Sequence, residues 1–132
     1  QMIEELKQRQ PVVMAYLLSD NFYLLTEQEK DMLLYFALVI RKSYQKTNDG
    51  QEPEAISEDE MGNAEEANWA RLEDSSAKTF RERLDIFFAD TPQEDLLAFF
   101  EDVLIDDEEE ITTKAGREYI FVAAKSIVDI WC

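Results

Sequence analysis

Residues 32–40 read Met-Leu-Leu-Tyr-Phe-Ala-Leu-Val-Ile, the longest unbroken apolar run in the chain. The preceding stretch, Thr26-Glu27-Gln28-Glu29, matches a capping box, in which a hydroxyl and a glutamate satisfy the first amides of a helix. A helix that is apolar on every face has to be surrounded by other elements. We therefore expect a central hydrophobic helix over about 27–46.

Two further capping boxes lie downstream, at Ser57-Glu58-Asp59-Glu60 and at Thr91-Pro92-Gln93-Glu94. They predict helices near 58–74 and 92–105, the latter with proline at its first helical position. The helix near 58–74 has the weakest apolar stripe, so we expect it to be the most loosely packed.

The remaining segments are also helical in pattern. Apolar spacing predicts helices near 76–89 and about 113–131, the last being long and C-terminal. Pro11 interrupts the opening segment, which is either one kinked helix or two short helices. Three glycines and three prolines are too few for a hairpin-rich β fold. The expected fold class is all-α, a single-domain bundle of about six helices spanning 1–132.

The charge divides unevenly along the chain. Residues 1–47 hold six acids and six bases, so the whole net charge of −17 lies in residues 48–132. A loop at about 47–56, with Asn48-Asp49-Gly50 and Pro53, marks the boundary. Such a negative field attracts cations and basic proteins and repels polyanions. We therefore expect a basic or helical protein partner.

Several classes of chemistry are excluded by missing residue types. The chain has no histidine and one cysteine, which rules out Ser-His-Asp and Cys-His nucleophilic sites and zinc sites built on those ligands. No glycine-rich phosphate loop is present. We expect a protein that is not an enzyme and needs no cofactor. No apolar run approaches the about 20 residues of a bilayer span, so we expect a cytoplasmic protein outside the membrane.

Candidate metal sites are the acidic run Asp106-Asp107-Glu108-Glu109-Glu110 and the shorter run Glu58-Asp59-Glu60, because Ca²⁺ and Mg²⁺ prefer oxygen ligands. Each run also precedes or begins a predicted helix, whose positive N-terminal end favours negative charge without any bound ion. The ordinary explanation is therefore a set of solvated, dipole-complementing carboxylates.

The segment Glu110–Glu118 contains an apolar residue, a threonine and then Gly116-Arg117, and it resembles the strand-to-helix junction that follows the wing in winged-helix regulators. The resemblance implies DNA binding. A DNA-reading helix needs Lys and Arg to neutralise phosphates, and residues 84–113 contain neither. We therefore expect no direct nucleic-acid binding, and Gly116 is explained more simply by a close helix approach or an N-terminal turn.

Aromatic residues exceed what single helix faces can bury. In the doublets Phe87-Phe88 and Phe99-Phe100, the two neighbouring rings cannot point equally inward on one helix. The same holds for Tyr119 and Phe121, because Ile120 between them already defines the inner face of that helix. Surplus apolar surface indicates a partner or a homodimer. The expected partner-binding residues are Phe88, Phe99, Tyr119, Phe121 and Trp131. The sequence thus predicts a non-enzymatic protein-interaction module; the alternatives are a DNA mimic that inhibits a nucleic-acid-binding protein and a carboxylate site for a divalent cation.

Overall fold

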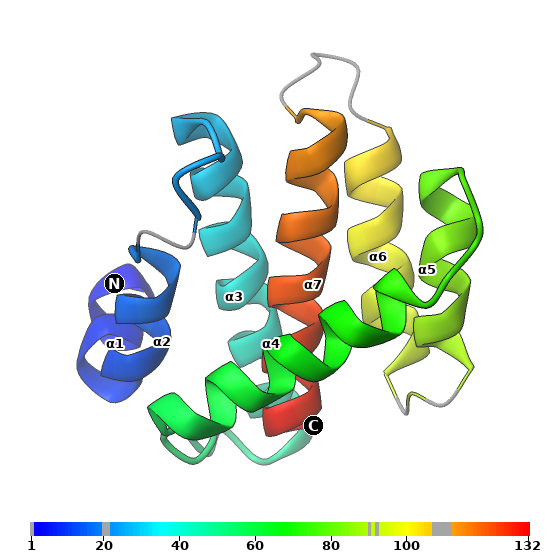
Figure 1. Cartoon of the computed structure of the whole chain (residues 1–132). Helices are drawn as coiled ribbons and strands as arrows, with labels where there is room; N and C mark the ends of the chain where they lie inside the picture. The colour runs from blue at the N-terminus through cyan, green and yellow to red at the C-terminus, as the bar shows by residue number, and fades with distance from the viewer. Residues whose placement is uncertain (1, 20–21, 90, 92, 107–111) are drawn as a thin grey trace.

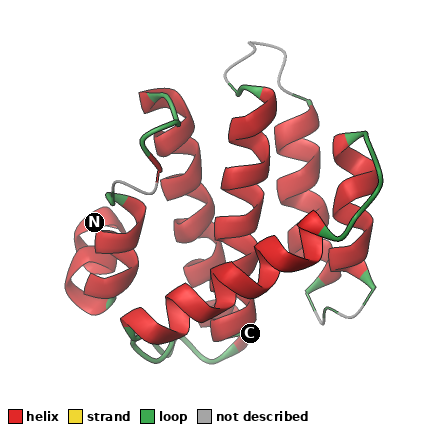
Figure 2. Ribbon diagram, viewed as in Figure 1, coloured by secondary structure: helices red, strands yellow, loops and turns green. Residues whose placement is uncertain are grey.

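The computed structural model describes residues 2–19, 22–89, 91, 93–106 and 112–132, and within these ranges it contains seven helices and no strand (Figures 1 and 2). The helices are α1 (Met2–Arg9), α2 (Pro11–Leu17), α3 (Glu27–Thr47), α4 (Glu58–Glu73), α5 (Phe80–Phe88), α6 (Glu94–Ile105) and α7 (Lys114–Trp131). The predicted all-α bundle with a long C-terminal helix is confirmed. The opening segment forms two short helices that meet at Pro11, not one kinked helix. The described residues therefore contain seven helices, where about six were expected.

The helix most completely enclosed is α7. It is flanked by α3 and α6, and α4 crosses it in front (Figure 1). Every residue from Ile120 to Val128 is buried, whereas α3 leaves Tyr35 51% exposed. Enclosure on every side, expected for α3, is therefore found for α7. Ala123, Ala124 and Ser126 are small enough for neighbouring helices to approach α7 from several directions.

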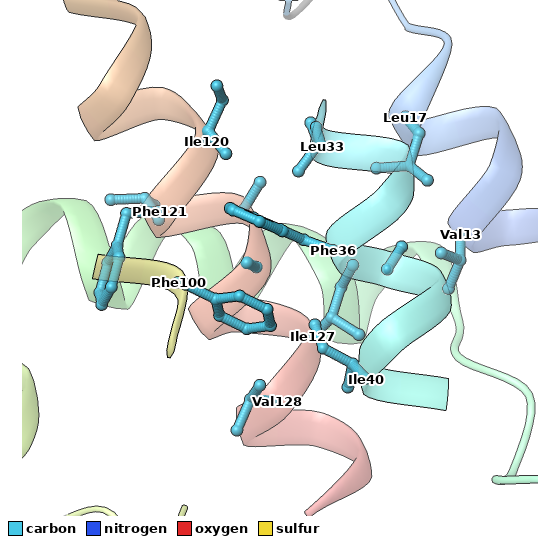
Figure 3. Close-up of a cluster of buried hydrophobic side chains, with 14 of the residues drawn as sticks. Val13, Leu17, Leu33, Phe36, Ile40, Phe100, Ile120, Phe121, Ile127 and Val128 are labelled. Atoms are coloured by element: carbon cyan, nitrogen blue, oxygen red, sulfur yellow. The ribbon is translucent and has the colours of Figure 1, made fainter. Parts of the chain in front are cut away.

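The core between α3, α6 and α7 is built on aromatic and aliphatic side chains (Figure 3). The rings of Phe36 and Phe100 lie 4.4 Å apart, and both side chains are fully buried. A second aromatic pair joins α5 to α7, where the rings of Phe87 and Phe121 stack 5.8 Å apart. Burial of each such side chain contributes roughly 1.5–3 kcal/mol, so these four residues are principal contributors to the stability of the bundle.

A buried carboxylate joins the beginnings of α3 and α7. Glu29 completes the capping box of α3 by accepting a hydrogen bond from the Thr26 amide at 2.9 Å. Its second oxygen accepts from the amide of Thr113, also at 2.9 Å, and from the hydroxyl of the same residue. A β-carbon placed on Gly116 would lie 1.8 Å from this oxygen, so only glycine leaves room for it. The expected close helix approach at Gly116 is therefore observed.

Two details of the sequence prediction are wrong. The capping box at Thr26 and the one at Ser57 both form, but α6 begins at Glu94 with no side-chain cap on its first turn. The Thr91 hydroxyl instead accepts from the Gln93 amide, which satisfies that donor within the loop.

The second error concerns α4, which is not loosely packed. Its Asn68 is buried and donates hydrogen bonds of 3.0 Å to Ser126 and to Asp129 of α7. A polar residue on the inner face therefore provides the attachment that the weak apolar stripe does not predict.

Replacing Gly116 with alanine tests the link between α3 and α7. The new methyl group displaces the Glu29 carboxylate and breaks its hydrogen bonds, so Gly116→Ala is expected to lower the free energy of unfolding by about 1–3 kcal/mol. The matched control is Gly62→Ala in α4, where the added carbon meets nothing within 4 Å. That substitution is expected to stabilise by about 0.5–1 kcal/mol, because alanine restricts the unfolded chain. Urea denaturation measures the free energy of unfolding of both variants. Equal effects of the two substitutions would contradict the role of Gly116 in leaving room for the Glu29 carboxylate.

Candidate functional site

The five aromatic residues expected at a partner surface do not form one exposed surface, because two of them are buried. Phe121 and Trp131 are buried at 0% and 7% exposure, so their expected exposure is wrong. The cause is the enclosure of α7, which buries side chains on more than one of its faces. Tyr119 is half-buried with its ring 5.1 Å from Trp69, Phe88 is half-buried on α5, and Phe99 on α6 is 39% exposed.

The longer acidic run proposed as a metal site lies mostly outside the described residues. Asp106 is exposed at the C-terminal end of α6, and Asp107, Glu108, Glu109 and Glu110 fall in the range that the structure does not describe. Within the described part of the chain, no group of three or more Asp, Glu or Cys residues could hold a metal ion. The cation hypothesis therefore stays a prediction.

A groove between α2 and α4 combines apolar walls with carboxylates. Its volume is about 290 Å³. Its lining residues are Val12, Ala15 and Tyr16 from α2, Ser19 from the segment after α2, and Glu58, Met61, Gly62 and Glu65 from α4. Gly62 has no side chain to fill the space above it, which keeps this part of the groove open. The groove therefore offers an apolar floor of the kind that accepts part of a side chain or a small apolar group.

The charged side chains that line the α2–α4 groove are both carboxylates. Glu58 and Glu65 are two helical turns apart on α4, roughly 10 Å along its axis, and no Lys or Arg is among the described residues that line the groove. The Tyr16 hydroxyl donates a hydrogen bond to Glu65 across it. Burial and this carboxylate both raise the pKa of Tyr16, so its hydroxyl stays protonated and acts as a donor. The arrangement suits a cationic ligand with an apolar portion.

The groove is positioned by a polar clamp on the loop before α4. Arg41 of α3 is buried and pairs with Glu52 and, at 3.3 Å, with Glu5 of α1. Gln10 donates to the Pro53 carbonyl at 2.8 Å and accepts from the Ile56 amide, which fixes the loop beside the start of α2. Burial alone would raise the pKa of Glu52, but hydrogen bonds from Arg41 and Gln10 lower it below its ordinary value. The clamp therefore holds Glu52 ionised and places the start of α4 opposite α2.

Reasoning from the sequence alone did not find this groove. Tyr16 and Glu65 are 49 positions apart, and neither belongs to a recognisable motif. The one local signal is Gly62, a glycine inside a segment predicted to be helical, which often marks a close approach or an open space. The exposed position of Tyr35 has a clearer signal in the sequence. The run 32–40 is apolar on every face of its helix, so any face that no neighbouring helix covers exposes an apolar side chain.

The comparisons with known proteins give no match: no protein-family model, no curated protein and no solved structure is similar to this chain. Among the helices described here, none combines the length and apolar character needed to cross a membrane.

A double-mutant cycle tests whether Tyr16 and Glu65 join α2 to α4. Tyr16→Phe and Glu65→Ala are each expected to lower the free energy of unfolding by about 1 kcal/mol, since each removes one partner of a hydrogen bond. Because they remove the same interaction, the double variant should lose about as much as either single variant, with a coupling energy near 1 kcal/mol. Strictly additive losses in urea denaturation would show that the two side chains do not interact.

Proposed function

We propose that this chain is a protein-interaction module that binds a basic, amphipathic segment of another protein in the α2–α4 groove. The observation that carries the proposal is the pairing of an apolar floor with two carboxylates, Glu58 and Glu65, and no base in the lining. A ligand with apolar side chains between cationic ones complements both features at once.

The charge around the groove favours such a partner. Residues 47–70 contain eight acids and no base, and this range includes most of α4. Of the six acids on α4, all except the half-buried Glu65 are exposed to solvent. Their field draws basic partners toward this side of the molecule and speeds their association, and dissolved salt weakens the effect.

The spacing of the carboxylates suggests how the ligand is oriented. A helical ligand lying along α4 would present cationic residues to Glu58 and Glu65 if they were seven positions apart, because that spacing also covers two turns. Apolar residues between them would then face Met61 and Val12. The hydrogen bond from Tyr16 holds Glu65 in place before a ligand arrives, which lowers the entropy cost of binding.

Binding, not catalysis, is the role that the titratable groups of the groove support. Among the described residues that line the groove, three are titratable: the Glu58 and Glu65 carboxylates and the Tyr16 hydroxyl. Tyr16 keeps its proton because its pKa is raised, so it is suited to donating a hydrogen bond and not to accepting a proton from a substrate.

The direct test is fluorescence anisotropy with a labelled helical peptide of about 16 residues, carrying a leucine face flanked by lysines seven positions apart. The wild-type chain should bind it saturably, and more weakly as salt rises. The variant Glu58→Gln/Glu65→Gln should bind at least about tenfold more weakly, since two charge contacts are lost. Ala15→Arg, which places a bulky cation in the groove, should also abolish binding.

Three controls separate the groove from general charge attraction. Glu82→Gln/Asp85→Asn removes the same charge from exposed positions on α5 and should change the affinity less than about threefold. Ala70→Arg, on an exposed part of α4 outside the groove, should behave in the same way. A peptide with its leucines replaced by serines should bind poorly. Equal losses from the groove and control variants, or equal binding of the serine peptide, would overturn the proposal.

A further inference from the structure

The outer side of α3 carries an apolar face that no described helix covers. Tyr35 is 51% exposed there, and Leu38 and Val39 are half-buried. Met2 of α1 and Phe99 of α6, each 39% exposed, extend the apolar surface on the two sides of α3. This face is separate from the α2–α4 groove, and the inference drawn from it does not depend on the proposed function.

Two hollows flank α3 on this side. One, of about 310 Å³, lies between α1 and α3 and reaches from Tyr35 to Lys46. The other, of about 360 Å³, lies between α3 and α6 beside Phe99. Val39 and Ser43 line both, so α3 forms a ridge between two depressions. A second helix, with its own flanking side chains, can pack against a surface of this shape.

Charges are placed in a definite order along this ridge. We define the α3 face as the stripe of exposed or half-buried residues Asp31, Tyr35, Leu38, Val39, Lys42 and Lys46, which recur at helical spacing. An acid stands at one end, apolar residues occupy the middle, and bases stand at the other end. Asp31, Lys42 and Lys46 form no ion pair with any residue that the structure describes.

The order is self-complementary. Asp31 and Lys46 lie equally far from the midpoint between Leu38 and Val39, roughly 11 Å along the helix axis, and on opposite sides of it. A second α3 that runs antiparallel about that midpoint therefore places its Lys46 beside Asp31 and its Asp31 beside Lys46. The same operation sets Leu38 against the other copy's Val39. Contacts of this reciprocal kind define a twofold symmetric interface.

We propose that the α3 face is the contact surface of a symmetric homodimer in which two copies of α3 pack antiparallel. Leu38 and Val39 form its apolar centre, and two Asp31–Lys46 pairs fix its register. Tyr35 comes to the level of Lys42 of the other copy, where an ammonium group can lie over the aromatic ring.

The distribution of charge favours a second copy as the occupant of this face. Each copy carries a net charge of −17, so association through the acidic part would bring like charges together. The α3 face lies within residues 1–47, which hold six acids and six bases. The two copies therefore meet through segments that sum to zero, and the pairing of opposite ends specifies the antiparallel register.

Sedimentation equilibrium of the full chain with reversed charges tests this interface. Wild-type chains should dimerise reversibly. Asp31→Lys and Lys46→Asp should each weaken the dimer at least about tenfold, since each turns two attractive pairs into repulsive ones. Carrying both changes in one chain restores opposite charges and should return the dissociation constant to within about threefold of wild type. Glu66→Lys and Lys78→Asp, reversals at exposed positions away from this face, are the matched controls.

Mixing the single variants gives the sharpest outcome. Asp31→Lys chains and Lys46→Asp chains should each be monomeric alone, but together they should form a heterodimer, because every contact then joins opposite charges. Circular dichroism checks that each variant keeps its helical content. A wild-type chain that stays monomeric at all concentrations would overturn the proposal. A dimer that the charge reversals do not weaken, or a mixture of the two single variants that does not associate, would also overturn it. None of these outcomes bears on peptide binding at the α2–α4 groove, which is a separate proposal.

Discussion

The two longest helices begin side by side because one buried carboxylate serves both of them. Glu29 is fully buried, and its hydrogen bonds with Thr26 and Thr113 satisfy amides at the start of α3 and of α7. A buried charge without such partners would be costly, so the arrangement fixes how the two helices align along their length. The absence of a side chain on Gly116 is the steric condition for it.

Around that pair, the remaining helices leave two surfaces with different physical character. The α2–α4 groove lies where α4 crosses the bundle, and the acids of α4 give it a negative rim. The α3 face belongs to the electrically neutral N-terminal segment and carries charges of both signs. The clamp of Arg41 and Glu52 connects the two, because it ties the loop before α4 to the inner side of α3. Attraction of a cationic partner and association of identical chains can thus use separate sides of one small bundle.

The sequence predicted helix positions well because the signals for helices are local. The capping boxes at Thr26 and Ser57 form as expected, and Pro11 begins a helix, since each depends on residues a few positions apart. It could not predict which faces are enclosed, because this depends on contacts between distant segments. Phe121 packs against Phe87 of α5, and Asn68 donates a hydrogen bond to Ser126 of α7, so the burial of each involves a distant segment. The hydrogen bond between Tyr16 and Glu65 has the same long-range origin.

Native-state hydrogen exchange tests the central role of the α3–α7 pair most directly, because it resolves the free energy of opening residue by residue. The account predicts that the slowest amides lie in residues 120–128 of α7 and at Phe36, Ala37 and Ile40 of α3. It also predicts that both sets exchange only through the same global unfolding. Amides of α3 that open at a much lower free energy than those of α7 would contradict the account, because the two helices would then not form one cooperative unit.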